Sequence, residues 1–421
     1  MPPSASRLHL ADPFPVFLFD IDGVLIEPRG YRRATLETLA DFSAQMGLAA
    51  VPLPDETDLA FMEAHSITNE WDMIPLALAA ILESLAAHAA LPNLPAEMPA
   101  ALWALAAFFA AAPPPAALSL DYRTPITRLA AQAQTGEYPA QAVMRLAVSG
   151  LPDQDFPFPR LRRSPILPAL VAGARSATES PLTRRFQQIV LGSEAFARAY
   201  DLPVEPGLPG ALSRFDRPHL APAWRAFLPA QAAAGNLALA AYTMRPSQPA
   251  REVSVQPHGF TPEAEMALDL LGWGDIPLIG YGRVAYYAEQ AGLAAESLLK
   301  PAPFQALAAL LAALTGQEAP ALEQAGRLFR DHTAPLPPAL TGRALALHVF
   351  EDSPGGLTAA RRAAELLAAR GVSLSVQLHG VAADAVKQAR LAQTGAQVTA
   401  DVNQALAALF PALDKTPPPA L

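Results

Sequence analysis

The stretch Val16-Phe17-Leu18-Phe19-Asp20-Ile21-Asp22-Gly23-Val24-Leu25 decides the fold class. Its leading apolar residues predict a short strand that is buried on both faces, as in a parallel sheet. Asp20 and Asp22 follow at once, and Gly23 indicates a sharp turn. Open α/β sheets bind ligands at the carboxyl ends of their strands. Two carboxylates placed there repel each other unless a cation or a proton lies between them. This pattern favours a functional site over the alternative, a strand end with two solvated acids.

Composition narrows the class of protein. The chain has 421 residues, of which 52% are hydrophobic, and this is ample for a sizeable core. A formal charge of −9 argues against a general nucleic-acid binder, whose surface is basic. The absence of cysteine excludes disulfides, thiolate metal sites and a cysteine nucleophile. The most apolar run, 100–112, is shorter than the roughly 20 residues that a bilayer requires. We therefore expect a soluble cytoplasmic protein with no nucleic-acid or membrane partner.

Strand patterns are found before residue 27 and again after residue 236. The later ones alternate with helical patterns, which predicts an α/β fold with a doubly wound parallel sheet. The expected strands are 237–243, 276–280, 344–350, 372–378 and 396–400, and the expected helices are 262–272, 283–291, 303–314, 356–369 and 402–410. Residues 10–27 and 236–412 are thus expected to form one core domain, followed by a proline-rich, frayed tail at 413–421.

Residues 28–235 are expected to form a large, mainly helical insertion after the first strand. Helical periodicity is seen at 31–46, at 58–66, in a helix that runs to about 88, and at 183–202, with a break near Gly192. The alanine- and proline-rich part, 89–120, is consistent with either a poorly ordered excursion or short helices joined by stiff turns.

Further polar groups follow later strands. Thr243 comes directly after an apolar strand, where its hydroxyl suits an anionic oxygen, although a helix N-cap is the commoner role of such a threonine. Lys300 is one of only three lysines, beside Lys387 and Lys415, in a chain that otherwise uses arginine. This scarcity indicates that a compact ammonium is required at this position, although most lysines are solvated. The adjacent acids Glu351 and Asp352 are costly after a buried strand unless they bind a cation or solvent.

In their order along the chain these motifs resemble those of the haloacid dehalogenase-like hydrolase superfamily. The resemblance is carried by Asp20-x-Asp22-Gly, Thr243, Lys300-Pro301 and Glu351-Asp352-Ser-Pro-Gly-Gly, and it covers roughly 10–27 and 236–412. It implies a Rossmann-like core, and it implies that the insertion is an enlarged helical cap of the first type. The fold class and the domain organisation above agree with it.

The resemblance also implies an activity, that of a magnesium-dependent phosphomonoesterase acting on a small phosphorylated metabolite. Asp20 would be the nucleophile that becomes an aspartyl-phosphate, and Asp22 the general acid and base. Thr243 and Lys300 would bind phosphoryl oxygens. Asp20, the main-chain carbonyl of Asp22, Glu351 and Asp352 would hold Mg²⁺. Arg245, just past Thr243, is a candidate for binding a substrate anion.

Two other functions remain open from the sequence. A phosphosugar mutase would share every core residue, because the two reactions differ only in whether water or a substrate hydroxyl attacks the phosphoenzyme. A non-catalytic binding or scaffold protein on the same core is also compatible with the fold.

Overall fold

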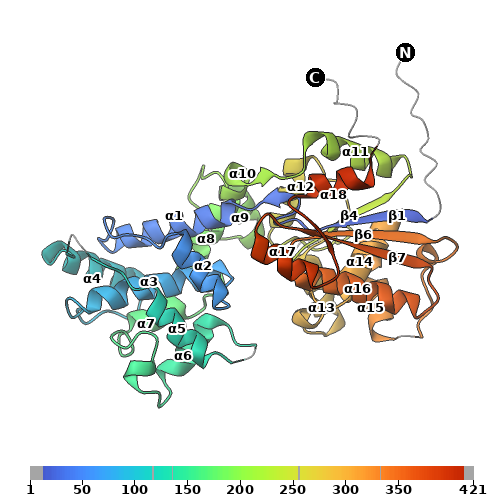
Figure 1. The fold of residues 1–421 in the computed structure, drawn as a ribbon. Coiled ribbons are helices and arrows are strands. Elements are labelled where there is room, and N and C mark those ends of the chain that lie inside the picture. The colour runs from blue at the N-terminus through green and yellow to red at the C-terminus, as the bar shows by residue number, and fades with distance from the viewer. Residues whose placement is uncertain (1–12, 116–117, 135, 255–256, 332, 412–421) are drawn as a thin grey trace. The chain divides into compact units, whose positions relative to one another are not determined.

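The computed structural model describes residues 13–115, 118–134, 136–254, 257–331 and 333–411. The predicted tail at 413–421 and Lys415 lie outside these described residues. The chain divides into two compact units: Met1–Arg29 with Phe215–Leu421, and Gly30–Arg214. Figure 1 shows the elements of both units. Among the described residues, no helix combines the length and the apolar character needed to cross a bilayer.

The first unit contains a six-stranded parallel sheet in the order β5-β4-β1-β6-β7-β8. Its strands are β1 (Phe14–Phe19), β4 (Ala238–Tyr242), β5 (Leu278–Ile279), β6 (Leu345–Glu351), β7 (Leu374–Val381) and β8 (Gln397–Thr399). Every strand expected from the sequence is present, and the Rossmann-like α/β fold is confirmed. The chain builds outward from β1 to β4 and β5, then crosses to the other side of β1. This reversal of strand order beside β1 is where α/β sheets form ligand crevices.

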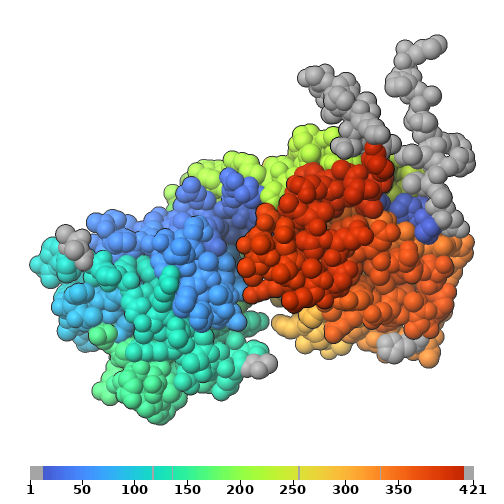
Figure 2. Space-filling model, viewed as in Figure 1, coloured from blue at the N-terminus to red at the C-terminus, as the bar shows by residue number. Residues whose placement is uncertain are grey.

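Helices cover both faces of this sheet. They are α11 (Pro222–Ala233), α12 (Glu263–Leu271), α13 (Tyr281–Ala291), α14 (Phe304–Thr315), α15 (Glu318–Arg330), α16 (Pro354–Ala368), α17 (Ala385–Ala392) and α18 (Val402–Leu409). Val16 and Leu18 of β1 pack into a core cluster with α14 and α16, whereas Phe17 and Phe19 pack into another with α12 and α18. On the face shown in Figure 2, the segment after β6, drawn in orange to red, forms much of the surface of this unit.

The second unit is helical, as expected. Its elements are α1 (Gly30–Gln45), α2 (Glu56–Ala64), α3 (Glu70–Ala86), α4 (Met98–Ala111), α5 (Arg123–Gln132), α6 (Pro139–Ala147), α7 (Ile166–Val171), α8 (Pro181–Leu191) and α9 (Ser193–Tyr200). The break expected near Gly192 lies between α8 and α9, where this residue has a φ of +79°. The alanine-rich part that the sequence left open contains α4, which ends before the proline run.

The boundary of the insertion differs from the expected one. The second unit ends at Arg214, so residues 215–235 belong to the sheet-containing unit instead. Two features explain this. Strand β3 (Arg217–Pro218) pairs with β2 (Ile26–Glu27), and Trp273 donates a hydrogen bond from its indole nitrogen to the Arg225 carbonyl at 3.0 Å. These contacts, and Leu228 of α11 in the core of the first unit, are long-range and leave no local pattern in the sequence.

Candidate functional site

The pairing of β1 with β6 brings acidic side chains together at the carboxyl end of the sheet. Phe19 pairs with Phe350, and the Asp20 amide donates to the Phe350 carbonyl at 2.9 Å, so Asp20 lies beside Glu351. Asp352 follows at the end of β6. One carboxylate oxygen from each of Asp20, Glu351 and Asp352 lies within 4.8 Å of the other two. We call these three residues the carboxylate cluster.

Two glycines make room for this cluster. Gly23 has a φ of +75°, and a Cβ on it would collide with the Asp352 carboxylate. Gly356, in the first turn of α16, lies against the Glu351 carboxylate, which leaves no space for a side chain. The glycine after Asp22 is therefore needed both for the turn and for the close approach of Asp352.

Lysines reach the cluster from the loop before α14 and from the first turn of α17. The Lys300 ammonium donates to Asp20 Oδ1 and to the Tyr242 carbonyl, each at 3.1 Å, and makes a short contact with Glu351. Lys387, in α17, forms an ion pair with Asp352. The sequence pointed to Lys300 but assigned no role to Lys387. The scarcity of lysine, which singled out Lys300, applies equally to Lys387 and was the signal that could have identified it.

Burial perturbs the charges of the cluster. The side chain of Glu351 is fully buried, and Ser353 donates to it from both its hydroxyl and its amide. Desolvation raises the pKa of Asp20 to about 7, although the Lys300 charge opposes this. Desolvation also raises the pKa of Asp352 to about 6, and the Asp20 charge adds to that rise. Burial lowers the pKa of Lys300, but the charges of Asp20 and Glu351 outweigh it and leave that pKa above its ordinary value.

The donor set fits a hard divalent cation. It consists of carboxylate oxygens alone, which are the ligands that Mg²⁺ prefers. Burial raises the pKa of Asp20 and that of Asp352, so these two carboxyl groups tend to hold protons that a cation can replace. Among the described residues, only Asp20, Glu351 and Asp352 form such a group of potential metal ligands.

Asp22 lies outside this cluster and is held by Arg245. The guanidinium donates from Nε to both Asp22 oxygens, at 3.1 and 3.2 Å, and from Nη1 and Nη2 to Asp216 Oδ2, at 3.0 Å each. The Arg245 side chain is fully buried, whereas that of Asp22 is 33% exposed. This arrangement does not support the expectation that Arg245 meets a substrate anion, because two carboxylates already engage it. Asp216 was not anticipated from the sequence.

Thr243 lies at the carboxyl end of β4, the strand that neighbours β1 on the side opposite β6. It is buried, and its hydroxyl accepts a hydrogen bond from the Arg245 amide at 3.2 Å. Gln305 of α14 donates to the Thr243 carbonyl at 2.8 Å and thereby fixes this strand end. The threonine stabilises a local turn and does not cap a helix, since α12 begins at Glu263.

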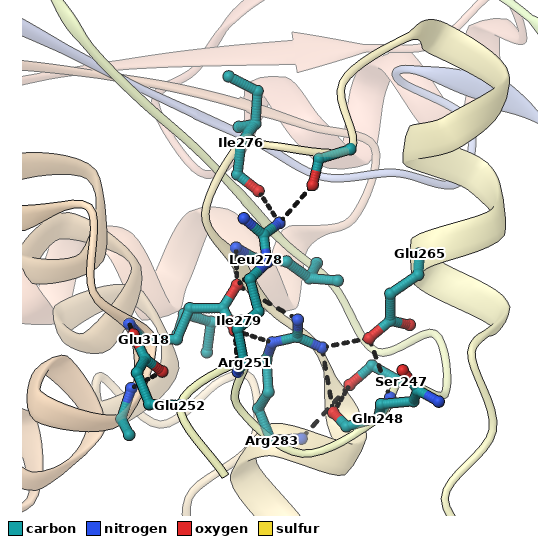
Figure 3. A network of polar contacts seen from close by, with 12 residues as sticks. Ser247, Gln248, Arg251, Glu252, Glu265, Ile276, Leu278, Ile279, Arg283 and Glu318 are labelled. Carbon is teal, nitrogen blue, oxygen red and sulfur yellow. Dashed lines mark hydrogen bonds and ion pairs between the residues drawn. The ribbon is translucent and has the colours of Figure 1, made fainter. Parts of the chain in front are cut away.

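The segment that follows Thr243 is anchored by a second set of buried charges, shown in Figure 3. Arg283 of α13 donates to Glu318 Oε2 at 2.8 Å and to the Gln248 carbonyl at 3.0 Å, and it pairs with Glu265. Glu318 also accepts from the amides of Arg251 and Leu278, at 3.0 and 2.9 Å. We call Arg251, Glu252, Glu265, Arg283 and Glu318 the arginine network.

Comparisons with known proteins inform on the fold alone. No protein-family model matches the chain, and no curated protein sequence matches it significantly. A solved structure with a similar fold is an X-ray structure of a Northeast Structural Genomics Consortium target, ZR25. The two are 14% identical, the alignment covers 95% of this chain and 99% of the other, and the TM-score is 0.59.

Proposed function

We propose that the protein is a magnesium-dependent phosphomonoester hydrolase with a haloacid dehalogenase-like core, acting on a small phosphorylated metabolite. The observation that carries this proposal is the convergence of Asp20, Glu351 and Asp352 around one point, with Lys300 bound to the first two. These residues come from three separate parts of the chain: the end of β1, the end of β6 and the segment before α14. In this proposal, the helical unit is the cap.

The proposed reaction has two steps. A carboxylate oxygen of Asp20 attacks the phosphorus, and the bond to the leaving oxygen breaks as Asp22 gives that oxygen a proton. Asp22 then takes a proton from water, whose oxygen attacks the aspartyl-phosphate and releases inorganic phosphate. Asp20, Glu351 and Asp352 would hold Mg²⁺, together with the main-chain carbonyl of Asp22. When bound, the cation offsets the repulsion between the carboxylates and the phosphate.

The chain's own residues support these roles to different degrees. Lys300 places its ammonium on Asp20, where it favours an ionised nucleophile and can also face a phosphoryl oxygen. Asp22 is near enough in sequence to share the site, but both its oxygens accept from Arg245. To transfer a proton, Asp22 must turn at least one oxygen away from this guanidinium. Thr243 lies at the adjacent strand end, where its hydroxyl can donate to a phosphoryl oxygen while it accepts from the Arg245 amide.

The proposal is tested by hydrolysis of p-nitrophenyl phosphate with magnesium and, in parallel, with EDTA. We expect turnover with magnesium and its loss with the chelator. Absence of turnover in both conditions, together with inactivity against a panel of phosphorylated metabolites, would contradict a hydrolase and favour a binding protein. Conversion of a sugar phosphate to its isomer without release of phosphate would identify a mutase instead.

A further inference from the structure

Lys387 is the feature of the carboxylate cluster that the proposed reaction does not use. Its ammonium pairs with Asp352, whereas Lys300 pairs with Asp20 and Glu351. The chain contains only three lysines, and both of those within the described residues bind this one cluster. Apart from Lys415, the other side chains among the 30 lysines and arginines of the chain are arginines. Such a distribution indicates that a flexible ammonium group matters at position 387.

The position of Lys387 in its helix is unfavourable by itself. Asp384 is the N-cap of α17 and accepts a hydrogen bond from the Lys387 amide at 2.8 Å, so Lys387 lies in the first turn. A positive charge at the N-terminus of a helix opposes the helix dipole. The contact with Asp352, which lies on another element, compensates for this placement. The lysine is thus explained by the cluster and not by its own helix.

Charge and exposure define what Lys387 does there. When ionised, the three carboxylates carry three negative charges against two ammonium groups. Lys300 is buried, but the Lys387 side chain is 44% exposed, so it can leave Asp352 for solvent. Asp352 is an oxygen donor that a divalent cation needs, and Lys387 holds one of its oxygens.

We propose that Lys387 competes with the divalent cation for Asp352 and thereby weakens cation binding to the cluster. This inference rests on the cation site of the proposed function. In the cation-free protein Lys387 neutralises Asp352, and the cation must displace it. In the cation-bound protein the same ammonium remains nearby and repels the cation. Both effects have the same sign, so removal of this one charge tightens binding.

The test is isothermal titration of the full-length protein with Mg²⁺, and in parallel with Mn²⁺, at pH 8. This pH lies above the pKa values of about 7 and 6 of Asp20 and Asp352, so both acids are ionised. The variant is Lys387→Met, which keeps the length of the side chain and removes its charge. We expect the dissociation constant of the cation to fall about tenfold. This is the size of effect expected when one positive charge is removed from beside a bound cation in a partly hydrated site.

Two further variants separate competition from other effects. Arg390→Met removes an exposed positive charge from the last turn of the same helix and should change the dissociation constant less than about twofold, because solvent and salt screen it. Lys387→Arg restores the charge with a planar fork that binds a carboxylate more firmly. It should return the constant to the wild-type value or above, and a constant as low as that of Lys387→Met would contradict the proposal.

The outcomes distinguish this inference from the proposed function. An unchanged or weakened cation affinity in Lys387→Met overturns the inference, even if the wild-type protein hydrolyses phosphate esters. Tighter binding supports it, even if no phosphatase activity is found. Binding by Lys387→Met alone, with none in the wild type, supports it as well. Absence of cation binding in every variant overturns both.

Discussion

The carboxylate cluster and the arginine network contain the same kinds of charge but arrange them in opposite ways. Each combines three acids and two bases in the sheet-containing unit, and each has buried members joined to more exposed ones. In the network, the guanidinium of Arg283 lies between Glu265 and Glu318 and keeps these carboxylates apart. In the cluster, Lys300 bridges Asp20 and Glu351, yet the carboxylates of Asp20, Glu351 and Asp352 still converge on one another.

The difference also appears in the remaining hydrogen bonds. Glu252 accepts from the amides of Glu318 and Ala319, which lowers its pKa despite partial burial. The Asp20 carboxylate accepts instead from the Lys300 ammonium, and burial raises its pKa. Burial of charge is therefore no guide to function by itself. The feature that points to a functional site is the convergence of like charges, because their repulsion must be offset by other groups or by a bound cation.

The largest expected effect comes from changing Asp20, the proposed nucleophile. Asp20→Asn keeps the shape of the side chain but removes the attacking oxygen charge. We expect phosphomonoester hydrolysis to fall by at least about a thousandfold, because the residue acts in every turnover. The measurement is steady-state release of p-nitrophenol. Asp269→Asn, on an exposed part of α12, is the matched control and should retain wild-type turnover. Retained activity in Asp20→Asn would contradict the assigned nucleophile.

A change in the arginine network should act on stability instead. Arg283→Met leaves Glu318 and Glu265 without their shared guanidinium, in a place where the arginine side chain is 1% exposed. Loss of one partner of a buried ion pair costs about 3–5 kcal/mol of unfolding free energy. Urea unfolding measures this.

Two companion variants calibrate that measurement. Arg283→Lys should give an intermediate loss, because one ammonium cannot span both carboxylates. Arg327→Met removes an exposed partner of Glu323 and should change stability by less than about 1 kcal/mol. A loss of turnover in Arg283→Met under conditions where the protein remains folded would show that the network is more than structural.

A substitution at Lys300 tests whether the carboxylate cluster requires an ammonium group and not a guanidinium. Lys300→Arg keeps the charge but brings a wider, planar group between Asp20, Glu351 and the Tyr242 carbonyl. We expect kcat/KM to fall about tenfold to a hundredfold, because misplacement of a reacting group by about 1 Å has effects of this size. Stability in urea should change much less than in Arg283→Met. A near-normal kcat/KM would remove Lys300 from the proposed machinery.

The sequence predicted the cluster better than its surroundings, for a physical reason. The carboxyl ends of neighbouring parallel strands lie at the same edge of a sheet. Recognising the sheet therefore predicted that Asp20, after the strand ending at Phe19, would lie near the acids at the end of the strand that includes Glu351. The strands themselves were recognisable because they are apolar throughout, which is typical of a buried parallel sheet.

Pairings between loops could not be predicted in the same way. The contact of Arg245 with Asp216 joins residues that no periodicity connects, and Asp216 lies in a segment that the sequence assigned to the insertion. Helix α15 was not anticipated, so the position of Glu318 at its start, and with it the arginine network, was also missed. Lys387 differs from these, because its rarity was visible in the sequence and only its partner was not.

The smallest expected effect concerns the pH dependence of stability. The raised pKa of Asp20, about 7, means that the folded protein binds a proton there that the unfolded chain has already released. Unfolding free energy therefore falls as pH rises through 7, by about 1 kcal/mol between pH 6 and 8. His348 and His379 act with the opposite sign, because burial lowers the pKa of each to about 4. Their contribution to stability is lost as pH falls below about 6.5.

The Asp20 contribution is isolated by comparing the wild type with Asp20→Asn, since both proteins contain the histidine pair. In EDTA, urea unfolding at pH 6, 7 and 8 should show Asp20→Asn gaining about 1 kcal/mol relative to the wild type across this range. Saturating Mg²⁺ should stabilise the wild type more at pH 8 than at pH 6, because the cation replaces the proton that Asp20 has lost. If the unfolding free energies of the two proteins changed with pH in parallel, Asp20 would be ionised from pH 6 to pH 8. The Lys300 charge alone would then offset the repulsion among the three carboxylates.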